Sequence, residues 1–242
     1  MTAIKEEVCV KLDKTPVLSP GDIHIWQVST IISSAKFAEY KSLLTDAELE
    51  KAHFFESKHT MDSYVVSQGA LRMLLSNYLG VSSDLVRFGH RNKGKPFSLN
   101  NTGLYFNLSN SGRYVVIGFS LDSELGVDIE QIRPLPDLEE MIGTNFTANE
   151  IKFINSKPEE RLTRFFRFWT VKESYLKAIG EGMRLAPKNL EFSINNNDVK
   201  QLSVKGVPEQ DDWKFKEFSI SKDYVGTITY YMNNVKFKFM KL

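Results

Sequence analysis

The sequence predicts an α+β protein with two comparable lobes. Three observations support this prediction. In each half of the chain helices come first and strands follow, the longest helix lies in the middle of each half, and the halves share this coarse order without a residue-level repeat. We therefore expect an N-terminal lobe at residues 1–121 and a C-terminal lobe at residues 122–242.

In the N-terminal half, residues 23–28 are β-branched and aromatic and follow a Pro-Gly pair, which is typical of a strand. The segment Thr45-Asp46-Ala47-Glu48 predicts the start of a charged helix, and a longer helix follows that ends at Gly80. The apolar stripe of this longer helix contains Tyr64, Val65, Leu71, Leu75, Tyr78 and Leu79. Residues 104–119 then predict two strands with a hairpin-like turn at Asn110-Ser111-Gly112.

The C-terminal half opens with residues 126–130, where apolar and acidic side chains alternate as in a strand with two distinct faces. A capping box at Thr147-Ala148-Asn149-Glu150 predicts a short helix. A long helix rich in Phe and Trp follows from residue 158 and ends at Gly180 or Gly182. The remaining sequence predicts four strands, at residues 190–194, 213–220, 225–231 and 235–239.

The composition limits the possible partners. The formal net charge is +1, from 31 basic and 30 acidic residues, so no overall field attracts a nucleic acid or an anionic membrane. The single cysteine allows neither an intramolecular disulfide nor a cysteine-based zinc site. The N-terminus lacks the apolar run of a signal peptide, and no stretch reaches the length of a membrane span. We therefore expect a cytoplasmic protein.

Two acidic residues, Asp128 and Glu130, lie two positions apart on a predicted strand, so their side chains point from the same face. Adjacent carboxylates repel each other unless a positive charge lies between them. A hard cation such as Mg²⁺ is one answer, because it prefers oxygen ligands. A solvated strand face is the other, and the spacing alone does not decide between them.

A second group of polar residues lies on the long helix of the C-terminal half. Glu173 and Lys177 are four residues apart and share a face, with Trp169 on the same side. This arrangement fits an ordinary surface ion pair, worth a few tenths of a kcal/mol. It equally fits a site in which a carboxylate and an ammonium hold a metal ion and a phosphate.

Together these segments resemble the phosphopantetheinyl transferases of the surfactin-synthetase type. Gly126-Val127-Asp128-Ile129-Glu130 is followed about forty residues later by Trp169-Thr170-Val171-Lys172-Glu173-Ser174-Tyr175-Leu176-Lys177. Gly94-Lys95-Pro96 is similar to the Gly-Lys-Pro loop of the family, and Asn107-Leu108-Ser109-Asn110-Ser111-Gly112 to its Asn-hydrophobic-Ser-His-Ser-Gly segment. The four motifs occur in the family's order and cover residues 45 to 183.

The resemblance implies two lobes related by a pseudo-twofold axis, each an antiparallel sheet packed against a long helix, with coenzyme A in the cleft between them. It implies that Asp128, Glu130 and Glu173 hold Mg²⁺. The expected reaction is attack by a serine of an acyl or peptidyl carrier protein on the β-phosphate of coenzyme A, with release of 3′,5′-ADP. Glu173 would act as the base and Lys177 would place a positive charge on the leaving side. Because two lobes of one chain can build the whole cleft, we expect a monomer.

The resemblance also implies contacts with coenzyme A. They are assigned to Lys95, Pro96, Ser109, Asn110, Ser111, Lys172 and Lys177, with Lys51 as a looser match to the family's basic helix. For Lys51 a solvated helix face is an equally good interpretation. Glu150 is a second candidate base, although its place in the capping box accounts for it without a catalytic role.

Two departures from the family pattern concern coenzyme A. Asn110 stands where the family has a phosphate-binding histidine, and asparagine can donate a hydrogen bond but carries no charge. The long N-terminal helix has Asp62 in the region from which relatives bring an arginine to the 3′-phosphate, and its only arginine is Arg72. Each lost contact to a charged group is worth about 1.5–3 kcal/mol. Two alternatives therefore stay open, a non-catalytic module that binds a carrier protein or coenzyme A and a metal-dependent hydrolase of a diphosphate.

Overall fold

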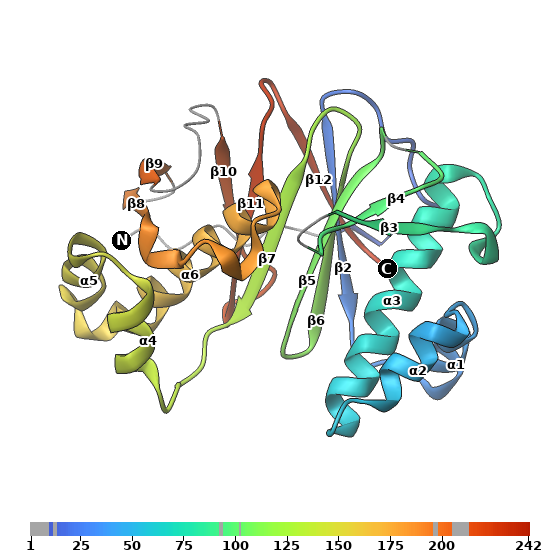
Figure 1. Cartoon of the computed structure of the whole chain (residues 1–242), viewed down its shortest axis with the longest axis horizontal. Coiled ribbons are helices and arrows are strands. Elements are labelled where there is room, and N and C mark those ends of the chain that lie inside the picture. Colours follow the sequence, from blue (N-terminus) through green and yellow to red (C-terminus); the bar gives the residue numbers. More distant parts are fainter. Residues whose placement is uncertain (1–9, 12–13, 92–93, 102, 196–197, 205–212) are drawn as a thin grey trace.

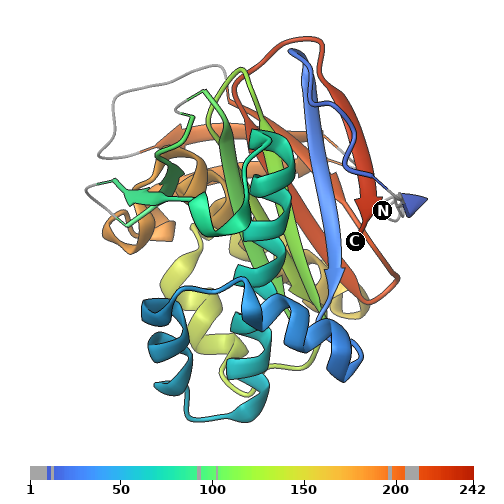
Figure 2. The same ribbon diagram turned by 90° about the vertical axis from the view of Figure 1, so that its right-hand side faces the viewer.

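Two sheets lie face to face between two long helices (Figures 1 and 2). The computed structural model describes residues 10–11, 14–91, 94–101, 103–195, 198–204 and 213–242. Among these residues the elements confirm an α+β fold. The layers run from the longest N-terminal helix, through a five-stranded and a three-stranded sheet, to the longest C-terminal helix.

The five-stranded sheet mixes antiparallel and parallel pairs. Its strands, in spatial order, are β1 (Val10–Lys11), β12 (Lys236–Lys241), β2 (Asp22–Ser29), β6 (Tyr114–Ser120) and β5 (Tyr105–Ser111). β12 pairs parallel with both β1 and β2, whereas β2, β6 and β5 pair antiparallel.

The other sheets are antiparallel throughout. The three-stranded sheet has the order β10 (Lys214–Phe218), β11 (Tyr224–Tyr230) and β7 (Leu125–Gln131). Two separate hairpins are formed by β3 (Phe88–His90) with β4 (Pro96–Ser98), and by β8 (Leu190–Asn195) with β9 (Asp198–Val204).

One long helix covers the outer face of each sheet. In the N-terminal half α3 (Lys58–Leu79) packs on the five-stranded sheet, beside α1 (Ser34–Ser42) and α2 (Asp46–His53). In the C-terminal half α6 (Arg161–Ile179) packs on β7 and β11, with α4 (Leu138–Asn145) and α5 (Ala148–Asn155) on the same side of the molecule (Figure 1). Short 3₁₀ turns lie at η1 (Ser83–Leu85), η2 (Pro158–Glu160), η3 (Gly182–Arg184) and η4 (Pro187–Asn189).

The helix boundaries follow the expected local chemistry. The capping boxes at Thr45 and Thr147 are both complete, with the side chain of the residue three positions later accepting from the cap N–H. The long helices end at Gly80 and Gly180, whose φ values of 65° and 71° lie in the left-handed region that glycine adopts without a steric cost.

The alternation along β7 separates a core face from a polar face. Val127 and Ile129 pack between the two sheets, so Asp128 and Glu130 point to the other face, toward α6. Gly126 lets the helix come close, because a Cβ at this position would lie 1.8 Å from the carbonyl oxygen of Ser174. The sequence pattern therefore sets both the direction of the two acids and the distance of α6.

Several elements depart from the expectations. The last strand, β12, was expected in the C-terminal lobe but pairs with β2 in the sheet of the N-terminal half. This sheet is therefore not purely antiparallel, and residues 236–241 lie outside the lobe in which the sequence division at 121/122 places them. The helices and strands that the expected pattern lacks include α1, α4, β3, β4 and β9.

Candidate active site

A row of β5 side chains joins the two sheets at their junction. β5 and β7 belong to different sheets and lie side by side (Figure 1). The Ser109 hydroxyl donates to Asp128 Oδ1 at 2.8 Å, and the Ser111 hydroxyl donates to Glu130 Oε2 at 2.6 Å. Asn107, on the same face of β5, accepts from a backbone N–H of β7 at 2.8 Å. These alternate residues therefore hold the two acids of β7 in place.

Lys177 reaches the same acids from α6. Its Nζ lies 2.6 Å from Asp128 Oδ1 and donates to the Ser109 hydroxyl at 3.0 Å and to the Val127 carbonyl at 3.2 Å. The Asp128 side chain is 5% exposed and that of Lys177 is 29% exposed. Of the two interpretations of Glu173 and Lys177, the surface ion pair along the helix is not the contact found, because Lys177 pairs with Asp128 between a helix and a strand.

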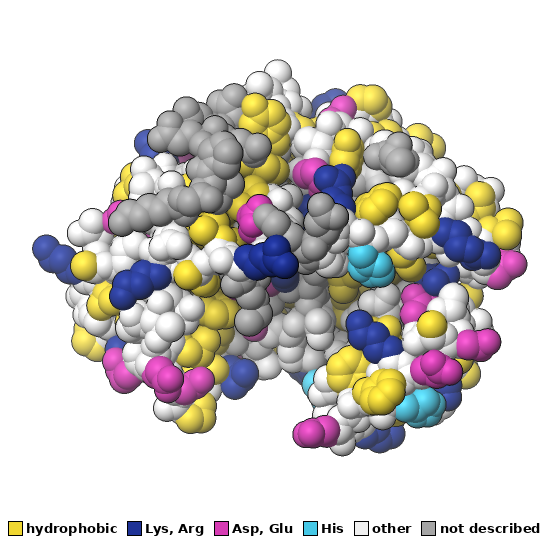
Figure 3. Space-filling model, in the orientation of Figure 1, with side chains coloured by type: hydrophobic (Ala, Val, Ile, Leu, Met, Phe, Trp, Pro, Cys, Tyr) yellow, Lys and Arg dark blue, Asp and Glu magenta, His cyan; other side chains and the backbone are white. Residues whose placement is uncertain are grey.

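A cavity of about 550 Å³ brings most of the predicted residues together. Six of them line it: Ser109, Asn110, Asp128, Glu130, Glu173 and Lys177. The space-filling view shows the molecule indented between the α4–α5 side and the α1–α2 side (Figure 3). Ser111 does not line the cavity itself, and its hydroxyl acts through Glu130.

The carboxyl groups of this cavity repel one another. Burial raises the pKa of Glu130 to about 7, and the charge of Asp128 adds to the shift, while the hydrogen bond from Ser111 opposes it. Burial also raises the pKa of Glu173, again helped by Asp128 and opposed by Lys177. One acid atom, Asp128 Oδ2, is buried and has no hydrogen-bond partner among the described residues. A buried carboxylate oxygen without a partner is costly unless a cation or donor meets it.

The residues fit a hard divalent cation by their chemistry. Three carboxylates face one cavity, one of their oxygens is buried without a partner, and two have raised pKa values that a cation would lower. Within the described ranges, however, no group of three or more acidic, histidine or cysteine side chains is arranged so that it could hold a metal ion. Asp128, Glu130 and Glu173 thus offer the right kind of donor around the cavity but are not gathered into a metal-binding arrangement in this structure.

Lys95 lies away from the cavity. Its ammonium forms an ion pair with Glu124 at 2.6 Å and donates to the carbonyls of Leu125 at 2.9 Å and Ala178 at 3.0 Å. The side chain is only 7% exposed, and burial lowers the pKa of Lys95 although Glu124 opposes this. The expected contact with coenzyme A is not supported by this position, because the ammonium joins the β3–β4 hairpin to the start of β7 and the end of α6.

Lys172 also turns away from the cavity. It is fully buried and its Nζ lies 2.7 Å from Glu150 Oε2. The expected role of Lys172 in binding coenzyme A is therefore not supported either, because the helix presents Lys172 and Glu173 to different surroundings. Glu150, the weaker candidate for the base, is 1% exposed and completes the capping box, so it has no access to a substrate.

Lys51 and Pro96 line a neighbouring cavity of about 380 Å³. This second cavity shares one lining residue, Leu108, with the first. Its other polar lining residues include Gln68 and His90. Lys51 is exposed, with its Nζ 5.5 Å from the centroid of a tyrosine ring, so its ammonium is available to an anion in this cavity.

The only arginine of α3 is used inside the protein. Arg72 is 3% exposed and donates to Glu48 Oε2 at 2.7 Å and to the carbonyl of Val86 at 3.2 Å. Asp62, on the same helix, pairs with Lys58. Neither residue therefore replaces the missing arginine contact to a phosphate.

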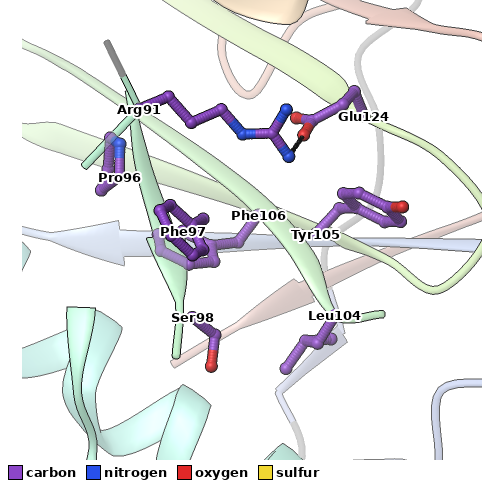
Figure 4. A pocket seen from close by; sticks show the side chains of 8 residues that line it. All are labelled: Arg91, Pro96, Phe97, Ser98, Leu104, Tyr105, Phe106 and Glu124. Atoms are coloured by element: carbon purple, nitrogen blue, oxygen red, sulfur yellow. Dashed lines mark ion pairs between the residues drawn. The ribbon is translucent and has the colours of Figure 1, made fainter. Parts of the chain in front are cut away.

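A third cavity, of about 410 Å³, is lined by residues of β4 and β5 and their neighbours (Figure 4). Of the predicted residues it contains only Pro96, and an ion pair between Arg91 and Glu124 closes one side of it. Its other lining residues are mostly apolar: Phe97, Ser98, Leu104, Tyr105 and Phe106.

Part of the main cavity comes from residues that the sequence pattern does not mark. Asn145, at the end of α4, and Ala186 and Pro187, before and at the start of η4, form one wall. They lie in segments without a recognisable motif, and only the fold brings them to the same cavity as the β5 residues. Leu108 and Leu176 could have been found, because they lie within the two motifs that carry the polar residues.

Comparisons with known proteins decide the family. The 4′-phosphopantetheinyl transferase superfamily model matches residues 124–229, and the model of the 4′-phosphopantetheinyl transferase N-terminal region matches residues 30–121. The chain is 32% identical over 199 residues to the 4′-phosphopantetheinyl transferase HetI of Nostoc sp., covering 80% of this chain and 84% of HetI. It belongs to the 4′-phosphopantetheinyl transferase superfamily.

Two further relatives show lower coverage. The transferase is 32% identical over 155 residues to the 4′-phosphopantetheinyl transferase gsp of Aneurinibacillus migulanus, covering 63% of this chain and 62% of gsp. It is 30% identical over 173 residues to the L-aminoadipate-semialdehyde dehydrogenase-phosphopantetheinyl transferase of Mus musculus, covering 64% of this chain and 56% of that protein. No helix in the described part of the transferase is both long and apolar enough to cross a bilayer.

Proposed function

We propose that this transferase moves the 4′-phosphopantetheine group of coenzyme A onto a serine of an apo acyl or peptidyl carrier protein, with Mg²⁺ as cofactor. The observation that carries the proposal is the cavity in which Asp128, Glu130, Glu173 and Lys177 meet. A diphosphate is the substrate group that such a site suits, because its charge needs a cation on one side and an ammonium on the other.

The reaction forms one P–O bond and breaks another. The serine oxygen of the carrier protein bonds to the β-phosphorus of coenzyme A. The bond between this phosphorus and the bridging oxygen of the diphosphate breaks, and 3′,5′-ADP leaves with that oxygen. Glu173 accepts the proton of the serine hydroxyl, since it is the acid of the helix motif and lines the cavity. Lys177 places its ammonium against the charge that develops on the leaving phosphate.

Mg²⁺, held by Asp128, Glu130 and Glu173, would neutralise the diphosphate and polarise its phosphorus toward attack. Ser109 and Ser111 keep the two β7 acids in register through their hydroxyls. Their proposed role therefore changes from phosphate contacts to support of the metal ligands, which is a common function of hydroxyls next to ligating carboxylates.

The nucleotide end of coenzyme A fits the second cavity. The two cavities share the lining residue Leu108, so a molecule whose diphosphate lies beside Lys177 can extend its nucleotide toward Lys51. Lys51 and His90 then supply the basic groups near the 3′-phosphate, because Arg72, the only arginine of α3, is engaged inside the protein. Both cavities are lined by one chain, which supports a monomer, and a cytoplasmic location stays a prediction.

The direct test mixes the protein with coenzyme A, MgCl₂ and several purified apo carrier proteins and follows the carrier mass. Transfer adds one phosphopantetheine group to the serine, and EDTA abolishes the gain. No mass gain on any carrier would contradict the proposal and favour a binding module. Release of 3′,5′-ADP without a carrier protein would instead favour a hydrolase.

A further inference from the structure

A buried ammonium ties together several segments of the C-terminal half. Lys172 Nζ donates to the carbonyls of Asn145 at 3.0 Å, Pro187 at 2.9 Å and Leu190 at 2.9 Å, in addition to its ion pair with Glu150. One lysine therefore holds the end of α4, the start of η4 and the start of β8 onto α6. The carbonyls at the end of a helix carry partial negative charge, so the end of α4 is a favourable place for a cation.

Glu150 organises the other side of this pair. Its Oε2 accepts from the Thr147 N–H at 2.8 Å, and its Oε1 accepts from the Phe192 N–H at 3.0 Å. The side chains of Glu150 and Lys172 are 0% and 1% exposed. Both oxygens of the Glu150 carboxylate therefore have hydrogen-bond partners. A buried ion pair is compatible with a stable fold only when its polar atoms are satisfied in this way.

Two of the carbonyls that Lys172 holds belong to residues of the catalytic cavity. Asn145 and Pro187 line it together with residues of β5, β7 and α6, and the part of the lining that they form is called the Asn145–Pro187 wall. Their backbone is not tied to α6 through a helix or sheet ladder, since α4 and η4 are separate elements. The next residue along α6 is Glu173, which lines the same cavity, so one helix carries both the proposed base and the ammonium that holds the wall.

We propose that Lys172 and Glu150 are a positioning pair that fixes the Asn145–Pro187 wall against the catalytic helix and thereby shapes the binding site for coenzyme A. The proposal rests on the proposed function for its kinetic consequence. Neither residue touches substrate, so the pair acts through the backbone of the wall. Its loss raises KM for coenzyme A more than it lowers kcat, because the chemical groups themselves stay in place.

The chain offers a matched control on the same helix. Arg167 Nε donates to Glu217 Oε1 at 2.7 Å, and both side chains are 1% exposed. This second buried pair joins α6 to β10, and neither residue lines the catalytic cavity. Its removal likewise takes a buried ion pair from α6, at residues that do not line the cavity.

The decisive variants remove both charges of a pair. Lys172→Met alone leaves a buried carboxylate without its cation and destabilises the fold. The double variant Lys172→Met/Glu150→Gln regains stability toward urea, because no uncompensated charge remains, but methionine cannot donate to the wall carbonyls. We expect its kcat/KM for coenzyme A to stay at least tenfold below that of the wild type. The control Arg167→Met/Glu217→Gln keeps kcat/KM within about twofold.

Amide hydrogen exchange tests the wall independently of activity. We expect faster exchange at residues 144–147 and 186–190 in the Lys172→Met/Glu150→Gln variant, and wild-type exchange there in the control double variant. If the Lys172→Met/Glu150→Gln variant regains wild-type kcat/KM, or if exchange at the wall is unchanged, the pair serves folding alone and the inference is wrong. A wild-type enzyme that transfers nothing would overturn the proposed function, while the exchange experiment still decides the role of the pair.

Discussion

Lys177 Nζ lies 2.6 Å from Asp128 Oδ1, so an ammonium of α6 meets a carboxylate of β7 at the junction of the two sheets. The contact satisfies only one of the two carboxylate oxygens, since Asp128 Oδ2 has no partner in the part of the chain that the structure describes. One oxygen of Asp128 thus contacts the Lys177 ammonium, which would in turn contact the phosphate. The other oxygen can be offered to a cation.

Replacing Asp128 by asparagine keeps the size of the side chain and removes its charge. We expect kcat to fall by about 100-fold or more, because the residue loses its metal affinity and its pairing with Lys177. Glu173→Ala abolishes turnover for a similar reason. The rate of carrier mass gain at saturating MgCl₂ measures the effect. Asp198→Asn, which makes the same change on the exposed strand β9, serves as the control. An Asp128→Asn rate within tenfold of wild type would show that the metal assignment is wrong.

Ser109→Ala removes the hydroxyl between Asp128 and Lys177. We expect activity to fall by about 10–100-fold, since residues that orient metal ligands have effects of this size. The half-saturating concentration of Mg²⁺ should rise as well, which a direct phosphate contact would not require. Titrating MgCl₂ at fixed coenzyme A separates these possibilities. Ser203→Ala, on the exposed face of β9, is the matched control and should leave both quantities unchanged.

Asn110→His introduces a basic group at an exposed position in the wall of the cavity. A protonated imidazole gains a charge-assisted bond to phosphate, worth about 1.5–3 kcal/mol, so KM for coenzyme A should fall roughly tenfold or more. Because the ordinary pKa of histidine is about 6.5, the gain should be larger at pH 6 than at pH 8. An equal KM in variant and wild type at pH 6 would show that position 110 does not face the diphosphate.

The sequence predicts the polar centre of the site better than its surroundings. Strict alternation on β7 and the i, i+4 spacing on α6 determine which way Asp128, Glu130, Glu173 and Lys177 point, and these residues do meet. Their motifs lie on the regular elements that pack against each other. Local patterns are sufficient there, because one strand and one helix carry all four residues.

Long-range partners explain why the rest could not be predicted. Lys95 is buried because Glu124 and two carbonyls meet its ammonium, and these lie far away in the sequence. Lysine is usually exposed, so no local rule indicates such burial. Likewise β12 pairs with β2 across almost the whole chain, although its own sequence reads like any strand of the C-terminal half. The missed elements α1 and α4 are short, and their stability depends on packing rather than on periodicity.

Gly126→Ala tests the close approach of α6 to β7. A Cβ would lie 1.8 Å from the carbonyl oxygen of Ser174 and 2.5 Å from the backbone nitrogen of Ala178, and neither backbone can move aside cheaply. We expect a loss of about 3 kcal/mol or more, a Tm lower by roughly 6–12 °C, and little activity. Gly143→Ala, where a Cβ in helix α4 meets nothing within 4 Å, should instead raise Tm slightly. Thermal unfolding of both variants measures the difference.

His24 makes the stability of the fold depend on pH between about 4 and 6.5. The ring is fully buried under α3, with Nδ1 2.7 Å from the Tyr78 hydroxyl, and burial lowers its pKa to about 4. The folded state therefore keeps His24 neutral where the unfolded chain binds a proton, so the contribution of His24 to the free energy of unfolding decreases as the pH falls from 6.5 to 4, whereas the raised pKa values of Glu130 and Glu173 act in the opposite direction in the wild type and in a His24 variant alike. The full loss from this residue is about 3 kcal/mol near pH 4. Urea unfolding across this range should show a flatter profile for His24→Gln than for wild type. The lowered pKa of Asp22 acts in the same direction but mainly below its ordinary value of 3.8, so equal slopes for variant and wild type above pH 4.5 would contradict the assignment to His24.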